Sequence, residues 1–208
     1  MKRLMSIYKK VLGQEFNRLH PKLQKRYDFS NHVPFQATGV MKTIRVGPKL
    51  LYPFLWLGTK YKLLFPEHGI NIPFTILNTP MIGLNGEEQI YWERIFFFEK
   101  KKRYFNALMS FDTKRSVIKD YLGEPRILYS DLVFTVSPQG DLKIESSKQR
   151  LVIGKVEIPL PKIFQGIATV TEKYSDEKHV FQIAVEVRNP LIGRIFSYEG
   201  EFKTNVLE

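Results

Sequence analysis

The chain has 208 residues, of which 43% are hydrophobic and 13% aromatic, and it contains no cysteine. This length suits one domain with a sizeable core, spanning residues 1–208, and the composition excludes a disordered chain or a disulfide-stapled scaffold. With 32 Lys and Arg against 21 Asp and Glu, the formal net charge is +11.

The positive charge is concentrated in the first third of the chain. Residues 1–70 contain 13 Lys or Arg and 3 Asp or Glu, whereas residues 71–208 contain 19 and 18. A basic, aromatic-rich segment can bind nucleic-acid phosphates or an anionic membrane surface, or it can form a merely solvated face. No nucleic-acid-binding motif accompanies the charge, so we do not expect a nucleic-acid partner.

Neither a leader nor a membrane-spanning segment is predicted. Met1-Lys2-Arg3 resembles the start of a signal peptide, but a charged amphipathic segment follows it. The most apolar run, residues 50–58, is about half the length that a transmembrane helix needs and contains Pro53. We expect a cytoplasmic protein.

The first seventy residues are predicted to form a basic, helical and aromatic cover. Ser6 is a candidate N-cap for a helix that Pro21 interrupts, and residues 21–27 fit a second short helix. Residues 38–46 fit a strand, and residues 49–65 are apolar nearly all round, as in a helix or irregular segment packed against a sheet.

From residue 71 onward the hydrophobic pattern has period two. Strands are expected over residues 73–78, 89–98, 104–111, 116–122, 127–136, 142–153, 167–174, 179–188 and 195–204. Their hairpin-length connections predict a mainly β fold, α+β at the margin: a strongly coiled antiparallel meander sheet or partial barrel of about 8–10 strands, with the N-terminal helices packed on it.

Catalytic and metal-binding patterns are absent. The four histidines are scattered and there is no cysteine, so we expect no metal and no cofactor. No nucleophile elbow or glycine-rich phosphate loop occurs. Carboxylates in or beside predicted strands could still meet as a hydrolytic pair: Glu93, Asp112, Asp120, Asp131 and Glu186.

The segment from Ile90 to Phe98 offers the strongest site candidate. Trp92, Arg94 and Phe96 share one face of this strand, and Glu93 lies on the other, among apolar neighbours. A buried charge needs a partner, so Arg94 either pairs with a carboxylate of the next strand or meets an anionic head group at the polar end of an apolar cavity. Arg188, near Glu186, is a further candidate.

The apolar residues 48–69 form the second candidate region. Trp56 with Lys49, Lys60 and Lys62 resembles an amphipathic lid or membrane-contact element. A buried cover whose lysines reach solvent explains the same pattern.

A series of short strings resembles a bacterial family of domains of unknown function. It comprises Leu19-His20-Pro21, Leu64-Phe65-Pro66-Glu67, Trp92-Glu93-Arg94, Gln149-Arg150 and Val187-Arg188-Asn189-Pro190-Leu191, in an order that covers residues 6–204. Similar domains occur alone or after oxidoreductase-like modules, which implies an accessory role. Because the chain begins at the shared helix, we expect the stand-alone form. The resemblance supplies no catalytic residues.

These observations predict a non-catalytic binding module rather than an enzyme. The expected ligand is a hydrophobic or amphipathic small molecule, anionic and lipid-like, held by Arg94, Trp92, Glu93, Arg188 and Phe96. The alternatives are a domain that docks on a protein or membrane surface and, less favoured, a hydrolase that uses cross-strand carboxylates.

Overall fold

The computed structural model describes residues 5–204, and Met1-Lys2-Arg3, considered above as a leader, lies outside them. In this part of the chain the elements follow one another as α1 (Ile7–Leu12), η1 (Gly13–Arg18), α2 (Pro21–Tyr27), β1 (Phe35–Val46), η2 (Lys49–Leu51), α3 (Tyr52–Lys60), β2 (Gly69–Ile82), β3 (Glu88–Phe98), β4 (Lys101–Tyr104), β5 (Ala107–Asp112), β6 (Val117–Leu122), β7 (Leu128–Val136), β8 (Leu142–Ile153), β9 (Val156–Pro159), η3 (Lys162–Phe164), β10 (Ile167–Ser175), β11 (Val180–Asn189) and β12 (Gly193–Thr204).

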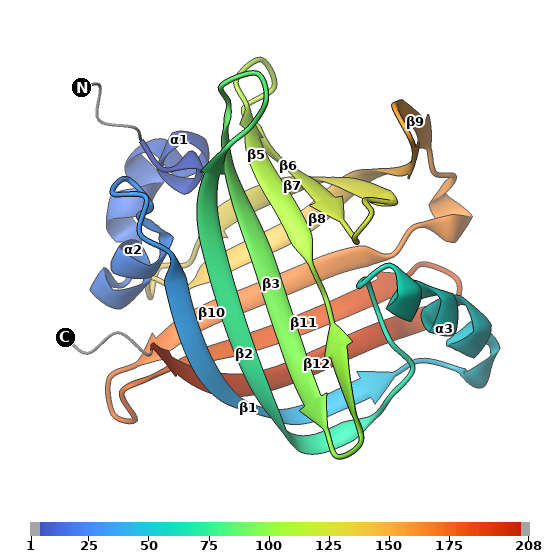
Figure 1. Ribbon diagram of the computed structural model, residues 1–208. Helices are drawn as coiled ribbons and strands as arrows, with labels where there is room; N and C mark the ends of the chain where they lie inside the picture. Colours follow the sequence, from blue (N-terminus) through green and yellow to red (C-terminus); the bar gives the residue numbers. More distant parts are fainter. Residues whose placement is uncertain (1–4, 205–208) are drawn as a thin grey trace.

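The strands close into a barrel (Figure 1). Within residues 5–204, ten antiparallel strands follow the order β1-β2-β3-β5-β6-β7-β8-β10-β11-β12, and β12 pairs with β1. Closure depends on the pairing of β8 with β10, in which residues 142–145 of β8 lie antiparallel to residues 169–172 of β10. The prediction of a mainly β fold with a coiled antiparallel sheet or barrel is therefore confirmed.

Two short strands lie outside this ring. β4 continues the line of β5 but pairs only with β3, after an irregular step at Phe105 and Asn106. β9 folds back on β8 as a projecting hairpin. Residues 99–103 and 154–166 lie between predicted strands. The structure extends strand pairing into both connections, because backbone groups there find a neighbouring edge, and the second also contains the helical turn η3.

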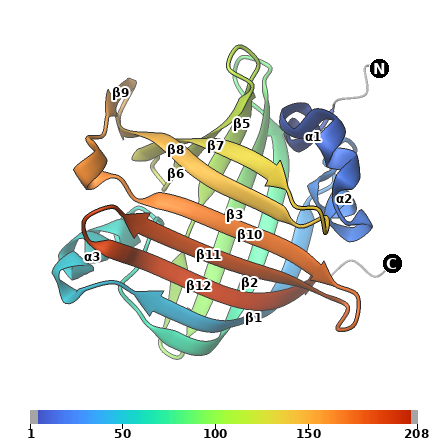
Figure 2. The same cartoon turned by 180° about the vertical axis from the view of Figure 1, so that it is seen from behind.

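The helices occupy the two ends of the barrel (Figure 2). α1, η1 and α2 cover one end, which we call the closed end, and α3 lies at the opposite, open end. Ser6 caps α1 as predicted, since its Oγ accepts a hydrogen bond from the Tyr8 N–H, and Pro21 occupies the first turn of α2. The basic first third therefore supplies both ends and also strand β1.

The closed end is filled by aromatic and apolar side chains. Tyr8 of α1 is fully buried against Tyr27 and Phe134, and its hydroxyl accepts a hydrogen bond from Trp92 Nε1 at 2.8 Å. Below it, rings from β2, β3 and β12 pack together with Phe65. These side chains fill part of the interior, and a cavity remains beneath α3 and η3.

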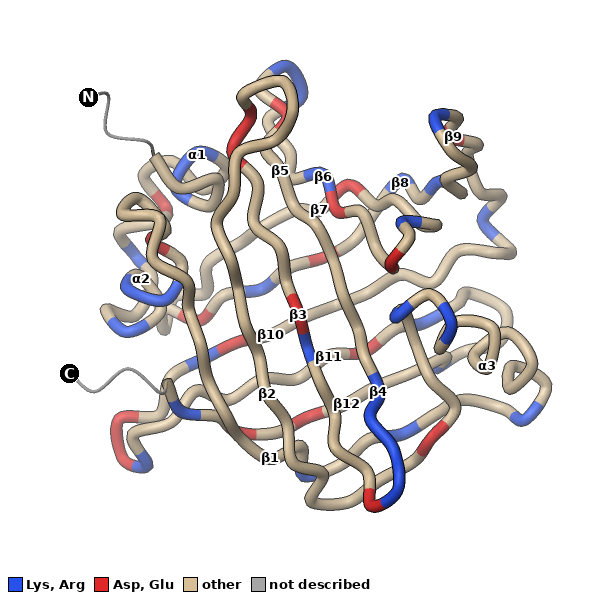
Figure 3. Tube along the Cα trace, in the orientation of Figure 1, with Lys and Arg blue, Asp and Glu red and all other residues tan. Residues whose placement is uncertain are grey.

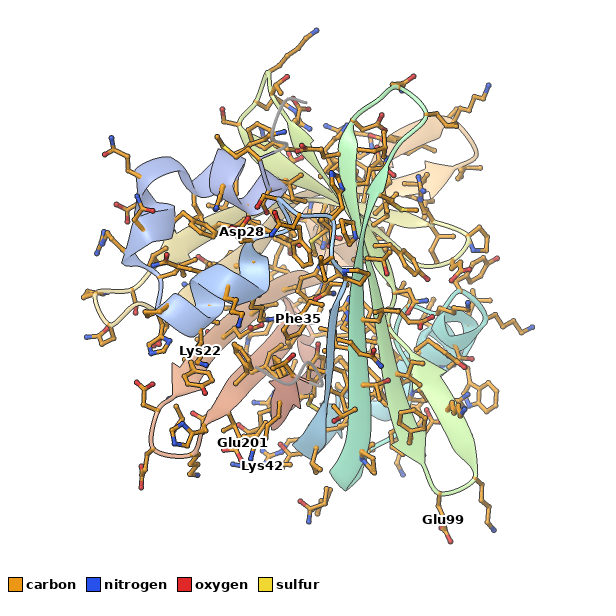
Figure 4. The ribbon with its side chains drawn as sticks, turned by 60° about the vertical axis from the view of Figure 1, so that its left-hand side comes forward. Lys22, Asp28, Phe35, Lys42, Glu99 and Glu201 are labelled. Atoms are coloured by element: carbon orange, nitrogen blue, oxygen red, sulfur yellow. The ribbon has the colours of Figure 1, made fainter. Side chains whose placement is uncertain are left out.

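The closed end also contains an ion pair between Arg26 of α2 and Glu172 of β10. Both side chains are essentially inaccessible to solvent. Arg26 donates to both Glu172 carboxylate oxygens and to Asn78 Oδ1, and the Tyr27 hydroxyl donates to Glu172 at 3.0 Å. The guanidinium also lies 4.3 Å from the ring centre of Phe35, where β1 starts beside α2 (Figure 4). Nothing in the local sequence indicated this pair.

Glycines allow β1 and β12 to approach closely where the barrel turns sharply. A Cβ at Gly39 would lie 2.1 Å from the carbonyl oxygen of Glu201, and one at Gly200 would lie 2.3 Å from that of Val40. Backbone atoms of a paired strand cannot move aside as a flexible side chain can. Glycine at these positions therefore permits the curvature that closure requires.

Replacing Gly39 by valine should destabilise the barrel by about 3 kcal/mol, because the added side chain forces β1 and β12 apart. Urea unfolding followed by circular dichroism measures this loss. Val40→Ala, at the next and outward-facing position, should change stability by less than about 1 kcal/mol. Equal stability of Gly39→Val and the natural chain would contradict the close approach.

Candidate functional site

The open end of the barrel leads into an apolar cavity of about 460 Å³. Its wall is formed by inward-facing residues of β3, β5 to β8 and β10 to β12, with α3 and η3 across the opening. Its lining combines small residues, Gly166 and Ala168, with medium-sized aliphatic side chains, which leaves room inside the barrel. The volume lies in the range of sites that hold small organic ligands.

Three polar side chains form the inner end of this cavity. Arg94 of β3, Asp120 of β6 and Tyr198 of β12 line it and are all buried. The alternation of β3 directs Trp92 and Arg94 inward together, and the matching alternations of β6 and β12 direct Asp120 and Tyr198 toward them. We call these three residues the polar cluster.

Arg94 is held by the irregular step between β4 and β5. Its Nε donates to the Phe105 carbonyl at 2.7 Å, and its guanidinium lies 3.9 Å from the Phe105 ring centre. No described carboxylate forms a salt bridge with it. Of the two alternatives for Arg94, the structure therefore shows the position at the polar end of a cavity rather than a closed ion pair with the next strand.

Asp120 and Tyr198 each keep an unused polar atom. Within residues 5–204, neither Asp120 Oδ1 nor the Tyr198 hydroxyl has a hydrogen-bond partner. Burial raises the pKa of Asp120 to about 7, and the positive charge of Arg94 opposes part of that rise. Burial also raises the pKa of Tyr198, again opposed by Arg94. At neutral pH the cluster thus contains one cation, one half-titrated acid and one neutral hydroxyl.

Two amide side chains hold the segment that connects η3 to β10 beside the cavity opening. Gln149 donates to the Gly166 carbonyl at 2.7 Å and accepts from the Gly166 N–H at 2.8 Å. Asn189 donates to the carbonyls of Ile163 and Gln165, both at 2.8 Å. This clamp fixes η3 and the β11–β12 turn as one side of the opening.

The other predicted ligand-binding residues are dispersed. Phe96 is buried in the aromatic core against Phe65 and Tyr198 and does not line the cavity. Glu93 lies on the half-buried outer face of β3, as the alternation implies. Arg188 is exposed and binds Glu186 at 3.1 Å on the outer face of β11. Only Trp92 and Arg94 of the five predicted residues reach the cavity.

The four predicted surface-contact residues lie in or just after η2 and α3. Lys49, Lys60 and Trp56 are exposed, and the Trp56 ring lies under the Arg103 guanidinium. Lys62 is half-buried and binds Glu124 at 2.7 Å. Within α3, Leu55 and Gly58 are buried whereas Phe54 and Leu57 are exposed, so the helix covers the opening with one side only.

The carboxylates considered for hydrolysis do not converge. Asp120 is the only Asp or Glu among the described residues that line the cavity. Asp112 and Asp131 both bind Arg115, and Glu186 binds Arg188 and Arg194. An open groove outside the barrel, between β6 and the β8–β9 hairpin, contains Glu124 and Glu157.

Both carboxylates of this outer groove are held ionised. A hydrogen bond from Lys62 lowers the pKa of Glu124, and bonds from Tyr121 and Arg150 lower that of Glu157 against the opposing effect of burial. Neither is a candidate proton donor. Among residues 5–204, no three His, Asp or Glu side chains gather as metal ligands, and no helix is long and apolar enough to cross a membrane.

The fold and the site thus define a class: a closed ten-stranded antiparallel β-barrel with an apolar internal cavity and a buried polar cluster. Residues 19–202 match the family described as Domain of unknown function (DUF4166), and the chain belongs to this family. It is also 42% identical over 200 residues to Uncharacterized protein YndH of Bacillus subtilis (strain 168), an alignment that covers 96% of this chain and 97% of that protein. No solved structure matches the chain.

Sequence reasoning missed most of the cavity. Asp120 was one of five carboxylates in predicted strands, and nothing local distinguished it from the others. Gln149 and Asn189 belong to the strings that resemble the family, but strand alternation alone marks every second residue as inward-facing. Knowing which inward residues border empty space requires the closed barrel.

Proposed function

We propose that the barrel binds a single hydrophobic or amphipathic molecule whose anionic head group, a carboxylate or a phosphate, lies against Arg94. The observation that carries this proposal is an apolar cavity of about 460 Å³ that ends at a buried guanidinium without a described carboxylate partner. An apolar ligand body would replace water along the wall, and the head group would supply the counter-charge.

The rest of the polar cluster favours the same arrangement. A carboxylate that binds Arg94 also repels an ionised Asp120, so it binds best when Asp120 is protonated. With the pKa of Asp120 at about 7, protonation near neutral pH is readily reached. Protonated Asp120 and the Tyr198 hydroxyl can then both donate hydrogen bonds to the head group.

The proposed role is accessory rather than catalytic. Among the described residues, a single carboxylate borders the cavity, so the two-carboxylate arrangement of most glycoside hydrolases has no counterpart there.

Native mass spectrometry of protein purified from its source, and binding of a dansyl-labelled undecanoic acid with displacement by oleate, test the proposal. Ala168→Trp fills the cavity and should weaken probe binding at least tenfold. Ala184→Trp makes the same change on the exposed outer face of β11 and should leave binding unchanged. Equal probe affinity of both variants, with no co-purified ligand, would overturn the proposal.

A further inference from the structure

The open end of the barrel exposes large apolar side chains in a continuous group. Leu50 is 75% exposed, Phe54 71%, Phe164 68% and Leu191 74%. Leu57, Ile163 and Ile192 are also exposed, and five of the seven line the cavity opening: Leu50, Phe54, Ile163, Phe164 and Ile192. We call these seven residues the rim. A group of this size is unusual on a free protein surface and indicates that something covers it.

The rim is built on three segments that converge at one end. η2 and α3 provide one side, η3 a second, and the β11–β12 turn a third. Asn189 joins the last two through its bonds to the carbonyls of Ile163 and Gln165. The β8–β9 hairpin projects from this same end in both views and exposes Ile153 and Val156 as well (Figures 1 and 2).

The segments that carry the rim contain cations but no carboxylates. Residues 47–65, 158–171 and 187–198 contain no Asp or Glu and six Lys or Arg. Three of the six, Lys62, Arg188 and Arg194, pair with Glu124 or Glu186 of neighbouring segments. Lys49, Lys60 and Lys162 are exposed there, and no described carboxylate forms an ion pair with them. The closed end carries charges of both signs (Figure 3), and Lys9 and Arg18 of its helices pair with Asp28 and Glu15.

We propose that the rim docks on the surface of an anionic lipid bilayer. Exposed apolar side chains beside Lys49, Lys60 and Lys162, which form no ion pair with a described carboxylate, match an interface of acyl chains beneath negative head groups. The docked orientation places the cavity opening against the lipids, so an amphipathic molecule could pass between bilayer and barrel without crossing water. The rim surrounds the cavity opening and extends past it to Leu57 and Leu191, so docking through the rim goes beyond the proposed binding function.

Flotation with lipid vesicles tests the docking. The full chain should float with vesicles of phosphatidylcholine and phosphatidylglycerol, bind much less to phosphatidylcholine alone, and dissociate as salt is raised. Reversing three charges beside the rim, in Lys49→Glu, Lys60→Glu and Lys162→Glu, should reduce partitioning onto the vesicles about a hundredfold. Phe54→Ser with Phe164→Ser should reduce it about tenfold while leaving the charge unchanged.

A matched triple variant separates local docking from net charge. Lys114, Lys173 and Lys203 are exposed and lie away from the open end, so their reversal to glutamate makes the same change in net charge and should leave most of the partitioning. Equal losses in the two triple variants would overturn the proposal. So would rim-dependent dimerisation in sedimentation velocity without vesicle binding, since a second copy of the chain would then be the occupant.

The cavity variant keeps the two proposals distinct. Ala168→Trp should float as well as the natural chain because its rim is intact, although it binds the dansyl probe weakly. Probe binding by a chain that never floats would overturn the docking alone. Flotation by a chain that binds no probe would overturn the cavity function alone.

Discussion

Arg26→Met should lower the free energy of unfolding by about 3 to 5 kcal/mol, because it leaves the Glu172 carboxylate buried without its cation. The Tyr27 hydroxyl would still donate to Glu172, but it supplies no positive charge. The lost stability is local to α2, which covers the closed end. We therefore expect α2 to separate from the barrel at a lower urea concentration than that at which the strands unfold. Urea titration followed by circular dichroism and, in a Trp56→Phe background, by Trp92 fluorescence measures both events.

A second substitution distinguishes charge from packing. Arg26→Met with Glu172→Met replaces the whole pair by apolar side chains of similar length and should recover most of the loss. If the double variant is as unstable as Arg26→Met alone, the cost comes from lost packing around the guanidinium rather than from the unpaired charge.

The exposed pair between Lys42 and Glu201 provides the control (Figure 4). It joins β1 to β12 at 2.7 Å, yet the Lys42 side chain is about half exposed. Water and salt screen such a pair, so Lys42→Met should cost less than about 1 kcal/mol. A comparable loss in Lys42→Met and Arg26→Met would contradict the importance of burial for the Arg26–Glu172 pair.

The strands could be predicted because each follows a local rule. Alternation along Ile90 to Phe98 correctly placed Trp92 and Arg94 on one face, and Pro21 correctly separated the first two helices. Barrel closure could not be predicted in the same way, because the pairing of β8 with β10 skips β9 and η3. The sequence pattern therefore allowed both an open coiled sheet and a barrel.

The site depended even more on long-range contacts. Arg26 and Glu172 are 146 residues apart, and the polar cluster comes from β3, β6 and β12. The apolar segment at residues 48–69 fitted a buried cover as well as a lid. Phe54 and Leu57 are exposed because the helix lies across an opening rather than over a closed core. Residues 158–164 contain two prolines and look like an ordinary connection, yet they form part of the rim.

Asp120→Asn should stabilise the protein at pH 8 by up to about 4 kcal/mol and leave its stability at pH 4 nearly unchanged. Burial raises the pKa of Asp120 from 3.8 to about 7 in the folded chain. Between these values the folded state binds a proton that the unfolded state has released, so the stability of the natural chain falls as pH rises from about 4 to 7. Asparagine cannot ionise, and the variant should lack this fall.

Asp112→Asn is the matched control, because its expected effect on stability at pH 8 has the opposite sign. Although burial raises the pKa of Asp112, its hydrogen bonds with Arg115 lower it below the usual value. The folded state therefore favours the ionised form, and removing that charge should reduce stability at pH 8 rather than increase it. Urea unfolding of all three chains at pH 4, 6 and 8 measures both signs.

The same series links Asp120 to the cavity. In the natural chain, affinity for the dansyl-labelled fatty acid should weaken as pH rises above 7, because ionised Asp120 then repels a carboxylate at Arg94. Asp120→Asn should bind the probe equally well at pH 6 and pH 8. Asp120→Asn could flatten the dependence of stability on pH and yet still bind the probe more weakly as pH rises. That result would show that Asp120 titrates as proposed but that the head group lies away from Arg94.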